Sequence, residues 1–176
     1  APGWGLAPGA EDPGMRLPIL AASPSGYANL VGAMSERALS EPGQRKPRHD
    51  LVNLSEAGGG LVALTGGRRG PLMRALRAGG ALSARRVLDV LVDAFGRDHV
   101  LVEWQGARGD EDEVGEVLAE LARASGTRLV ATSGARMSSP SKQALGDILA
   151  ANRLGSSLDE AEAHLGAHRS FLLSPA

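Results

Sequence analysis

The chain has 176 residues, with 43% hydrophobic, 22% charged and 3% aromatic side chains, and a formal net charge of −1. This composition is typical of a globular domain with an aliphatic core, and the charge argues against a protein that holds a nucleic-acid duplex by charge alone. Cysteine is absent and no apolar run approaches roughly 20 residues, which excludes disulfides, thiolate metal sites and a membrane partner and favours a cytoplasmic location. Residues 1–16 are rich in glycine and proline and predict an irregular linker or loop, not a signal peptide.

Residues 17–176 are expected to form the folded domain, in which short apolar strands alternate with amphipathic helices. Four strands are predicted, at residues 17–22, 61–65 and 99–104 and around Leu129 and Val130. We expect the last of these to be buried. This alternation predicts an α/β fold with a parallel sheet and outer helices, either an open sheet or a partial β/α barrel.

Helices are predicted from N-cap residues, from first-turn prolines and from apolar side chains at helical spacing. The expected starting points are Ser23, Pro71, Ser83, Asp110 and Ser139, with shorter helices from Asp50 to about Ala57 and from Ser157 to about Ala167. In the first helix, Tyr27, Leu30, Val31, Met34 and Ala38 fall on one face. We expect the apolar faces of the later helices to contact the core, with Leu88, Leu91, Leu118 and Leu121 in the middle helices and Ala144, Leu145, Ile148 and Leu149 in the last.

The loop after Val130 lies where an α/β fold of this kind places its chemistry, beyond the carboxyl end of a strand. It carries Ser133, Gly134, Arg136 and Met137, and no carboxylate, histidine or cysteine. This loop therefore predicts no catalytic residue of its own.

The loop after the second predicted strand contains Gly66, Gly67, Arg68 and Arg69. Its amides and guanidinium groups are a candidate site for a phosphate or a nucleic acid. The glycine spacing matches neither the dinucleotide-binding motif nor the P-loop. The alternative, which we favour, is a tight glycine turn with solvated arginines.

Other ionisable residues have simpler interpretations. Glu103, near the end of the third strand, is a candidate acid, base or ligand, but hydrogen bonding to a neighbouring strand or loop is the favoured interpretation. The acidic residues 110–113 fit the amino end of a helix, where the helix dipole favours negative charge. His164 and His168 have a metal-compatible spacing, yet they lie on a short helix near the end of the chain.

Six segments, in this order, resemble motifs of bacterial error-prone DNA polymerases, which are relatives of the DNA polymerase III alpha subunit. Residues 20–30 resemble LARDPEGYARL, residues 60–70 resemble a loop written LTGCRKG with Gly67 at the cysteine, and residues 95–103 resemble FGRDNVxVE. The remaining three are residues 130–133, which resemble VATN, residues 153–160, which resemble RxxxSLDE, and residues 171–175, which resemble LRSP.

The resemblance implies a polymerase-and-histidinol-phosphatase (PHP) domain, a distorted β/α barrel at the amino end of those polymerases. Residues 17–176 would be the later part of that barrel, and we expect the chain to be a piece of a longer polypeptide. Active domains of this family bind metal ions through histidines and carboxylates at the strand ends. The histidine-x-histidine strand of the family lies upstream of the matching region.

The resemblance also identifies three departures from an active metal site. Ala107 and Arg136 stand where active relatives have histidines, and Gly134 stands at an aspartate. Arginine keeps its proton and offers no lone pair to a metal, and its positive charge repels divalent ions. We therefore predict a degenerate site with no catalytic residue, no metal ligand and no cofactor in this segment, and we hypothesise that Arg136 pairs with Glu103 in place of a metal.

The predicted function is a non-catalytic segment, structural or subunit-docking, of an error-prone, translesion-type DNA polymerase. Such a polymerase is a nucleotidyltransferase whose polymerising residues lie elsewhere. The expected partners are the remaining domains of the polymerase chain and other replication or mutagenesis subunits, with weak or indirect DNA contact. Two alternatives stay open: a metal-dependent phosphoesterase acting on nucleotides or DNA ends, and a free-standing interaction module.

Overall fold

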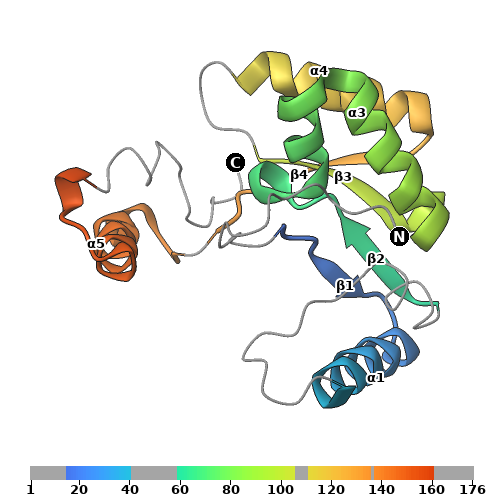
Figure 1. Cartoon of the computed structure of the whole chain (residues 1–176), viewed down its shortest axis with the longest axis horizontal. Coiled ribbons are helices and arrows are strands. Elements are labelled where there is room, and N and C mark those ends of the chain that lie inside the picture. Colours follow the sequence, from blue (N-terminus) through green and yellow to red (C-terminus); the bar gives the residue numbers. More distant parts are fainter. Residues whose placement is uncertain (1–14, 41–58, 106–110, 136, 161–176) are drawn as a thin grey trace.

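The structure is a computed structural model that describes residues 15–40, 59–105, 111–135 and 137–160 (Figure 1). Strands and helices alternate along these residues, so the predicted α/β class is confirmed. Three short 3-10 helices are labelled η1 to η3. The elements in chain order are β1 (Ile19–Ala21), α1 (Pro24–Ser40), β2 (Leu61–Leu64), η1 (Gly67–Arg69), α3 (Pro71–Phe95), η2 (Arg97–His99), β3 (Val100–Trp104), α4 (Glu111–Ser125), β4 (Arg128–Ala131), η3 (Pro140–Lys142) and α5 (Gln143–Leu154).

The described strands form one sheet in the order β1-β2-β3-β4. The strands β2, β3 and β4 are parallel, as predicted, but β1 runs antiparallel to β2, with Leu20 opposite Val62. The expectation of a parallel arrangement is therefore wrong for β1. The Ala22 N–H donates to the Gly60 carbonyl oxygen, so β1 ends beside the residue that precedes β2, and this contact joins two distant segments of the chain.

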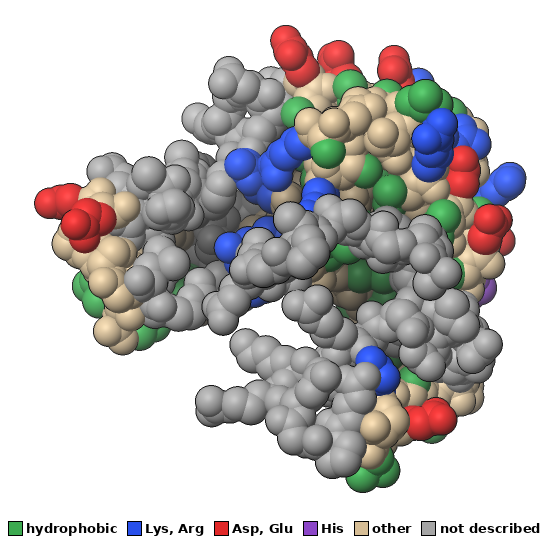
Figure 2. Space-filling view, viewed as in Figure 1, with side chains coloured by type: hydrophobic (Ala, Val, Ile, Leu, Met, Phe, Trp, Pro, Cys, Tyr) green, Lys and Arg blue, Asp and Glu red, His purple; other side chains and the backbone are tan. Residues whose placement is uncertain are grey.

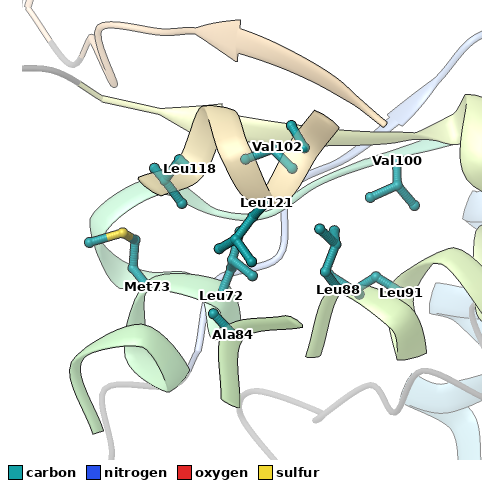
Figure 3. Close-up of a cluster of buried hydrophobic side chains, with 10 residues drawn as sticks. Leu72, Met73, Ala84, Leu88, Leu91, Val100, Val102, Leu118 and Leu121 are labelled. Carbon is teal, nitrogen blue, oxygen red and sulfur yellow. The ribbon is translucent and has the colours of Figure 1, made fainter. Parts of the chain in front are cut away.

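The hydrophobic core lies between the sheet and the two helices α3 and α4, which cover one face of it (Figures 1 and 3). From β3, Val100 and Val102 are completely buried. The predicted inner faces of the two middle helices are confirmed, since every leucine named for them is buried. The core residues are Leu72, Met73, Ala84, Leu88, Leu91, Val100, Val102, Leu118, Leu121 and Ala122.

Helix α3 is broken at Gly79 and Gly80, whose backbone angles are not helical. Gly80 has φ 67° and ψ −167°, a conformation that is essentially restricted to glycine. Two helices were predicted here, starting at Pro71 and Ser83. The first start is confirmed, whereas the second helical half begins ahead of Ser83, directly after the glycine pair.

Strand β4 is not buried, contrary to prediction. Leu129 is 42% exposed, and only Val130 of this strand is partly covered. The strand lies at the edge of the described sheet and pairs with β3 alone. An apolar run of this length predicts a strand, but it does not show that both faces of the strand are covered.

The expected burial of the last helix is also wrong, since Leu149 of α5 is 56% exposed. The single apolar face predicted for the first helix is exposed as well, with Tyr27 of α1 at 65% and Met34 at 51%. Helix α1 approaches β2 closely at its first turn, where Gly26 lies against Gly60. Helix α5 stands apart from the sheet in Figure 1, and Leu145, Ile148 and Leu149 of its apolar face are exposed.

The start of the last predicted helix is confirmed by its capping box. The Ser157 N–H and hydroxyl donate to Glu160 Oε2 at 3.0 and 2.9 Å, and the Glu160 N–H donates to Ser157 Oγ at 3.3 Å. The predicted helix at 50–57, the linker up to residue 14 and the chain beyond Glu160 lie outside the described residues. Within the described ranges, no helix has the length and apolar character needed to cross a bilayer.

Candidate functional site at the carboxyl ends of the strands

The carboxyl ends of β2, β3 and β4 meet at one edge of the sheet, because these three strands are parallel. Thr65 follows β2, Gln105 follows β3 and Thr132 follows β4. Backbone hydrogen bonds continue the strand pairing beyond the ends of the strands. The Thr65 N–H donates to the Leu101 carbonyl oxygen at 3.0 Å, and the Thr132 N–H donates to the Trp104 carbonyl oxygen at 2.9 Å. The residues that follow the strands are therefore fixed relative to one another.

Glu103 is the buried carboxyl group of this edge, with 4% of its surface exposed. Side chains alternate along a strand, so Glu103 points away from the face on which Val102 joins the core. Its Oε1 accepts hydrogen bonds from the Thr132 hydroxyl and, at 2.9 Å, from Gln105 Nε2. Its backbone N–H donates to Thr65 Oγ1 at 2.8 Å. Bonding to neighbouring elements, the favoured interpretation for Glu103, is confirmed for this oxygen.

The second carboxyl oxygen, Oε2, is buried and has no hydrogen-bond partner within the described structure. A buried acceptor without a donor is uncommon in a folded protein and calls for an explanation. Oε2 is thus the one unsatisfied acceptor of Glu103 at the strand ends.

Gln105 fills the space between the loops that follow β2 and β4. A Cβ atom placed on Gly67 would lie 2.3 Å from Gln105 Cδ, and one placed on Gly134 would lie 3.3 Å from it. Both glycines have positive φ, at 50° and 56°. The two loops therefore need glycine at these positions, and the amide that separates them is the group that donates to Glu103.

The loop with Gly66, Gly67, Arg68 and Arg69 forms a tight turn around η1. A Cβ on Gly66 would lie 1.8 Å from the Arg16 carbonyl oxygen, so no larger residue fits there. Burial, and then the charge of the nearby Arg77, lower the pKa of the Arg68 guanidinium below its usual value. The glycine turn is as expected, and binding of a phosphate or nucleic acid here stays a prediction.

Of the remaining candidates, His99 and Gly134 lie within the described residues. His99 ends η2 directly before β3, at the opposite end of the strand from Glu103. Of the three degenerate metal-site positions, Gly134 lies beside Gln105, as above. Ala107 and Arg136 lie outside the described residues, as do His164 and His168.

Sequence reasoning did not single out Thr65, Gln105 or Thr132, although all three contact Glu103. Their common signal is position: each one directly follows a strand. This signal identifies the contacts of Glu103 only once the register of the strands is known. Thr65 and Thr132 lie 38 and 29 positions away from Glu103 in the sequence, and strand pairing brings them next to it.

Comparison with known proteins identifies the family of this chain. The sequence matches the family described as "PHP domain" over residues 4–107, which is more than half of the chain. The chain belongs to the PHP domain family. The resemblance drawn from the sequence motifs is thereby confirmed, and the strand ends of this PHP domain are those described above.

The relatives that match this PHP domain are bacterial DNA polymerases. It is 39% identical over 153 residues to the error-prone DNA polymerase of Mycolicibacterium paratuberculosis, which covers 86% of the chain and 14% of the relative. It is also 39% identical over 161 residues to the error-prone DNA polymerase of Cutibacterium acnes, with 89% and 14% covered. The DNA polymerase III subunit alpha of Escherichia coli is 31% identical over 144 residues, with 82% and 12% covered. The chain spans about one seventh of the length of the first of these relatives.

Among the residues described at the strand ends of this PHP domain, Glu103 is the side chain with the chemistry of a metal ligand. Structural and catalytic metal sites need several carboxylate, imidazole or thiolate donors that converge. The described part of this edge supplies one carboxyl group, Glu103, and one of its oxygens already accepts two hydrogen bonds. Within the described ranges, no three His, Cys, Asp or Glu side chains group together as a metal site would require.

Proposed function

We propose that this chain is a structural segment of an error-prone DNA polymerase, in which the strand-end site of the PHP domain is degenerate and performs no chemistry. Residues 17–176 then form the later part of the barrel, residues 1–16 lead into it, and the polymerase acts in the cytoplasm. The match to much longer error-prone polymerases supports the parent protein. Polymerisation belongs to parts of that protein beyond this segment.

The observation that carries the proposal is the way in which Glu103 is held. Its Oε1 is engaged by Gln105 and Thr132, and the Gln105 amide occupies the space between Gly67 and Gly134. The side chain that contacts Glu103 here is therefore a neutral amide, which is neither a carboxylate nor an imidazole donor. Glu103 in this arrangement joins three strands and is not open to a ligand on that oxygen.

We further propose that Arg136 supplies the positive charge that a metal would otherwise provide beside Glu103. The unsatisfied Glu103 Oε2 supports this, because a buried carboxyl oxygen is normally paired or hydrogen-bonded. Arg136 follows Gly134 by two residues, and Gly134 lies against Gln105. A guanidinium donates bidentate hydrogen bonds to carboxylates and keeps its proton.

A double-mutant cycle tests this pair without any activity assay. Glu103→Gln, Arg136→Gln and the double variant are unfolded in urea, and the interaction energy is obtained from the three free energies of unfolding. Residues in contact couple by about 0.5–3 kcal/mol, whereas independent sites add within about 0.5 kcal/mol. Additive effects would contradict the pairing.

A docking role is supported by apolar side chains that the described structure leaves exposed. Leu145 and Ile148 of α5 are 49% and 51% exposed, and Val31 of α1 is 42% exposed. Contiguous exposed apolar surface marks contact sites on soluble proteins. We propose that these faces contact the remaining domains of the polymerase or one of its subunits.

Metal analysis of the purified full-length chain tests the proposed absence of catalysis. The expected result is substoichiometric zinc, manganese and iron, with the same trace amounts in Glu103→Gln as in the unmodified chain. A generic phosphatase assay with added manganese is expected to show no turnover. Stoichiometric metal that is lost in Glu103→Gln, together with phosphate release, would instead support the metal-dependent phosphoesterase.

A further inference from the structure

Basic residues are concentrated in one segment of this chain. Residues 59–88 contain six arginines and no aspartate or glutamate, although the chain as a whole has a net charge of −1. The acidic residues follow: ten of the chain's 20 lie between residues 89 and 120. The arginines are Arg68, Arg69, Arg74, Arg77, Arg85 and Arg86.

The fold brings four arginines together around the tight turn at η1. Arg77 Nη1 donates to the Arg68 carbonyl oxygen at 3.1 Å, and the Arg16 N–H donates to the Arg69 carbonyl oxygen at 3.1 Å. Arg77 is also close enough for its charge to lower the pKa of the Arg68 guanidinium. The structure therefore holds two like charges, those of Arg68 and Arg77, near one another beside this turn.

The backbone beneath these arginines has little freedom to change. Gly70 approaches Thr65 so closely that a Cβ atom on it would lie 1.7 Å from the Thr65 carbonyl oxygen. The neighbouring side chains of Arg16, Arg69 and Arg77 are nevertheless exposed. Figure 2 shows basic side chains near the start of α3 and also at the outer edge of the molecule, where the acidic side chains lie. A fixed backbone with exposed guanidinium groups is preorganised for an extended anion.

We propose that Arg16, Arg68, Arg69 and Arg77, here called the arginine surface, bind the phosphodiester backbone of a nucleic acid. A guanidinium presents its donors in a planar fork that matches two phosphate oxygens, and several guanidiniums side by side match a repeating anion. Such contacts position a nucleic acid without reading its sequence. The choice of nucleic acid over an acidic protein rests on the proposed function.

Salt-dependent binding to labelled oligonucleotides tests the arginine surface. The whole chain is titrated into a single-stranded oligonucleotide and into the matching duplex at several KCl concentrations, and binding is followed by fluorescence anisotropy. The test variant is Arg69→Gln with Arg77→Gln. The matched control is Arg86→Gln with Arg123→Gln, which removes two exposed arginines from other parts of α3 and α4.

Loss of two phosphate contacts is expected to reduce the slope of log K against log salt by about 1.4 for the single strand and about 1.8 for the duplex. The control is expected to keep the slope of the unmodified chain. Lysine at both positions, in Arg69→Lys with Arg77→Lys, is expected to restore most of the slope, because the positive charge is retained. Circular dichroism and urea midpoints establish that each variant is folded.

Equal slopes for the test variant and the unmodified chain would overturn the proposal. Polyglutamate that competes as well as the oligonucleotide would also overturn it, since the surface would then bind acidic proteins. Either failure leaves the metal content of the chain unaffected. Conversely, stoichiometric metal would contradict the proposed function and leave the salt slope as it is, so the two proposals fail separately.

Discussion

The packed centre of the molecule and its outer helices differ in what covers their apolar faces. Leu88 and Leu91 of α3 are completely buried against β3 and α4, whereas Ile148 and Leu149 of α5 are more than half exposed. Both helices carry apolar residues at helical spacing. The difference shows that an amphipathic pattern specifies which face of a helix is apolar, while burial depends on a second element being there to receive it.

The largest expected difference between the two regions comes from making the same leucine-to-alanine substitution in α3 and in α5. Leu88→Ala is expected to lower the free energy of unfolding by about 2–5 kcal/mol, because it leaves a cavity in the core. Leu149→Ala removes the same atoms from an exposed face and is expected to change the free energy by no more than about 0.5 kcal/mol. Urea unfolding followed by circular dichroism measures both. Equal losses would show that α5 is packed as tightly as α3.

Glycine substitutions extend the comparison from the strand-end edge to an outer helix. Gly66 has φ 82°, and a Cβ there would clash with the Arg16 carbonyl oxygen, so Gly66→Ala is expected to cost about 2 kcal/mol or more. Gly32 of α1 has open space around it, and Gly32→Ala is expected to stabilise the chain by about 0.5–1 kcal/mol. Thermal unfolding of the two variants shows whether each substitution stabilises or destabilises the chain. A stabilising Gly66→Ala would refute the described turn.

Removing a glutamate carboxyl group is expected to change the free energy of unfolding more at the buried strand-end edge than on the exposed surface. Glu103→Ala leaves the Thr132 hydroxyl and the Gln105 amide without their acceptor, which is expected to cost about 1–3 kcal/mol. Glu36→Ala, on the exposed part of α1, is expected to stay within about 0.5 kcal/mol. Chemical denaturation measures both. A neutral or stabilising Glu103→Ala would mean that Glu103 does not hold the strands together.

Patterns of short range in the sequence were sufficient for much of the fold. The helical spacing of Leu88, Leu118 and Leu121 predicted their burial, and the positions of Pro71 and Gly96 predicted helix ends that the structure confirms. These features depend on residues within a few positions of one another. Local propensity and periodicity therefore determine them without knowledge of the rest of the chain.

Features that depend on pairing between distant segments could not be predicted in the same way. The direction of β1 follows from a hydrogen bond between Ala22 and Gly60, and the position of Gln105 follows from the register of three strands. The exposure of Leu129 follows from its place in an edge strand. None of these has a signal in local composition, because each is set by which segment lies alongside.

The smallest expected effect concerns local order in an outer part of the chain, at the capping box of Ser157 and Glu160. Hydrogen bonds from the Ser157 backbone and hydroxyl lower the pKa of the Glu160 carboxyl below its usual range. Because the folded pKa is depressed, the capping box stabilises the helix start above the ordinary pKa of a glutamate. That stabilisation is lost as the pH falls through the lowered value.

Ser157→Ala removes the hydroxyl donor and is expected to raise the pKa of Glu160 toward its ordinary value, as measured by NMR titration of the carboxyl carbon. An unchanged Glu160 titration would show that the capping box does not persist in solution. A shift would show that this part of the chain, outside the central core, derives order from hydrogen bonds three residues apart in the sequence.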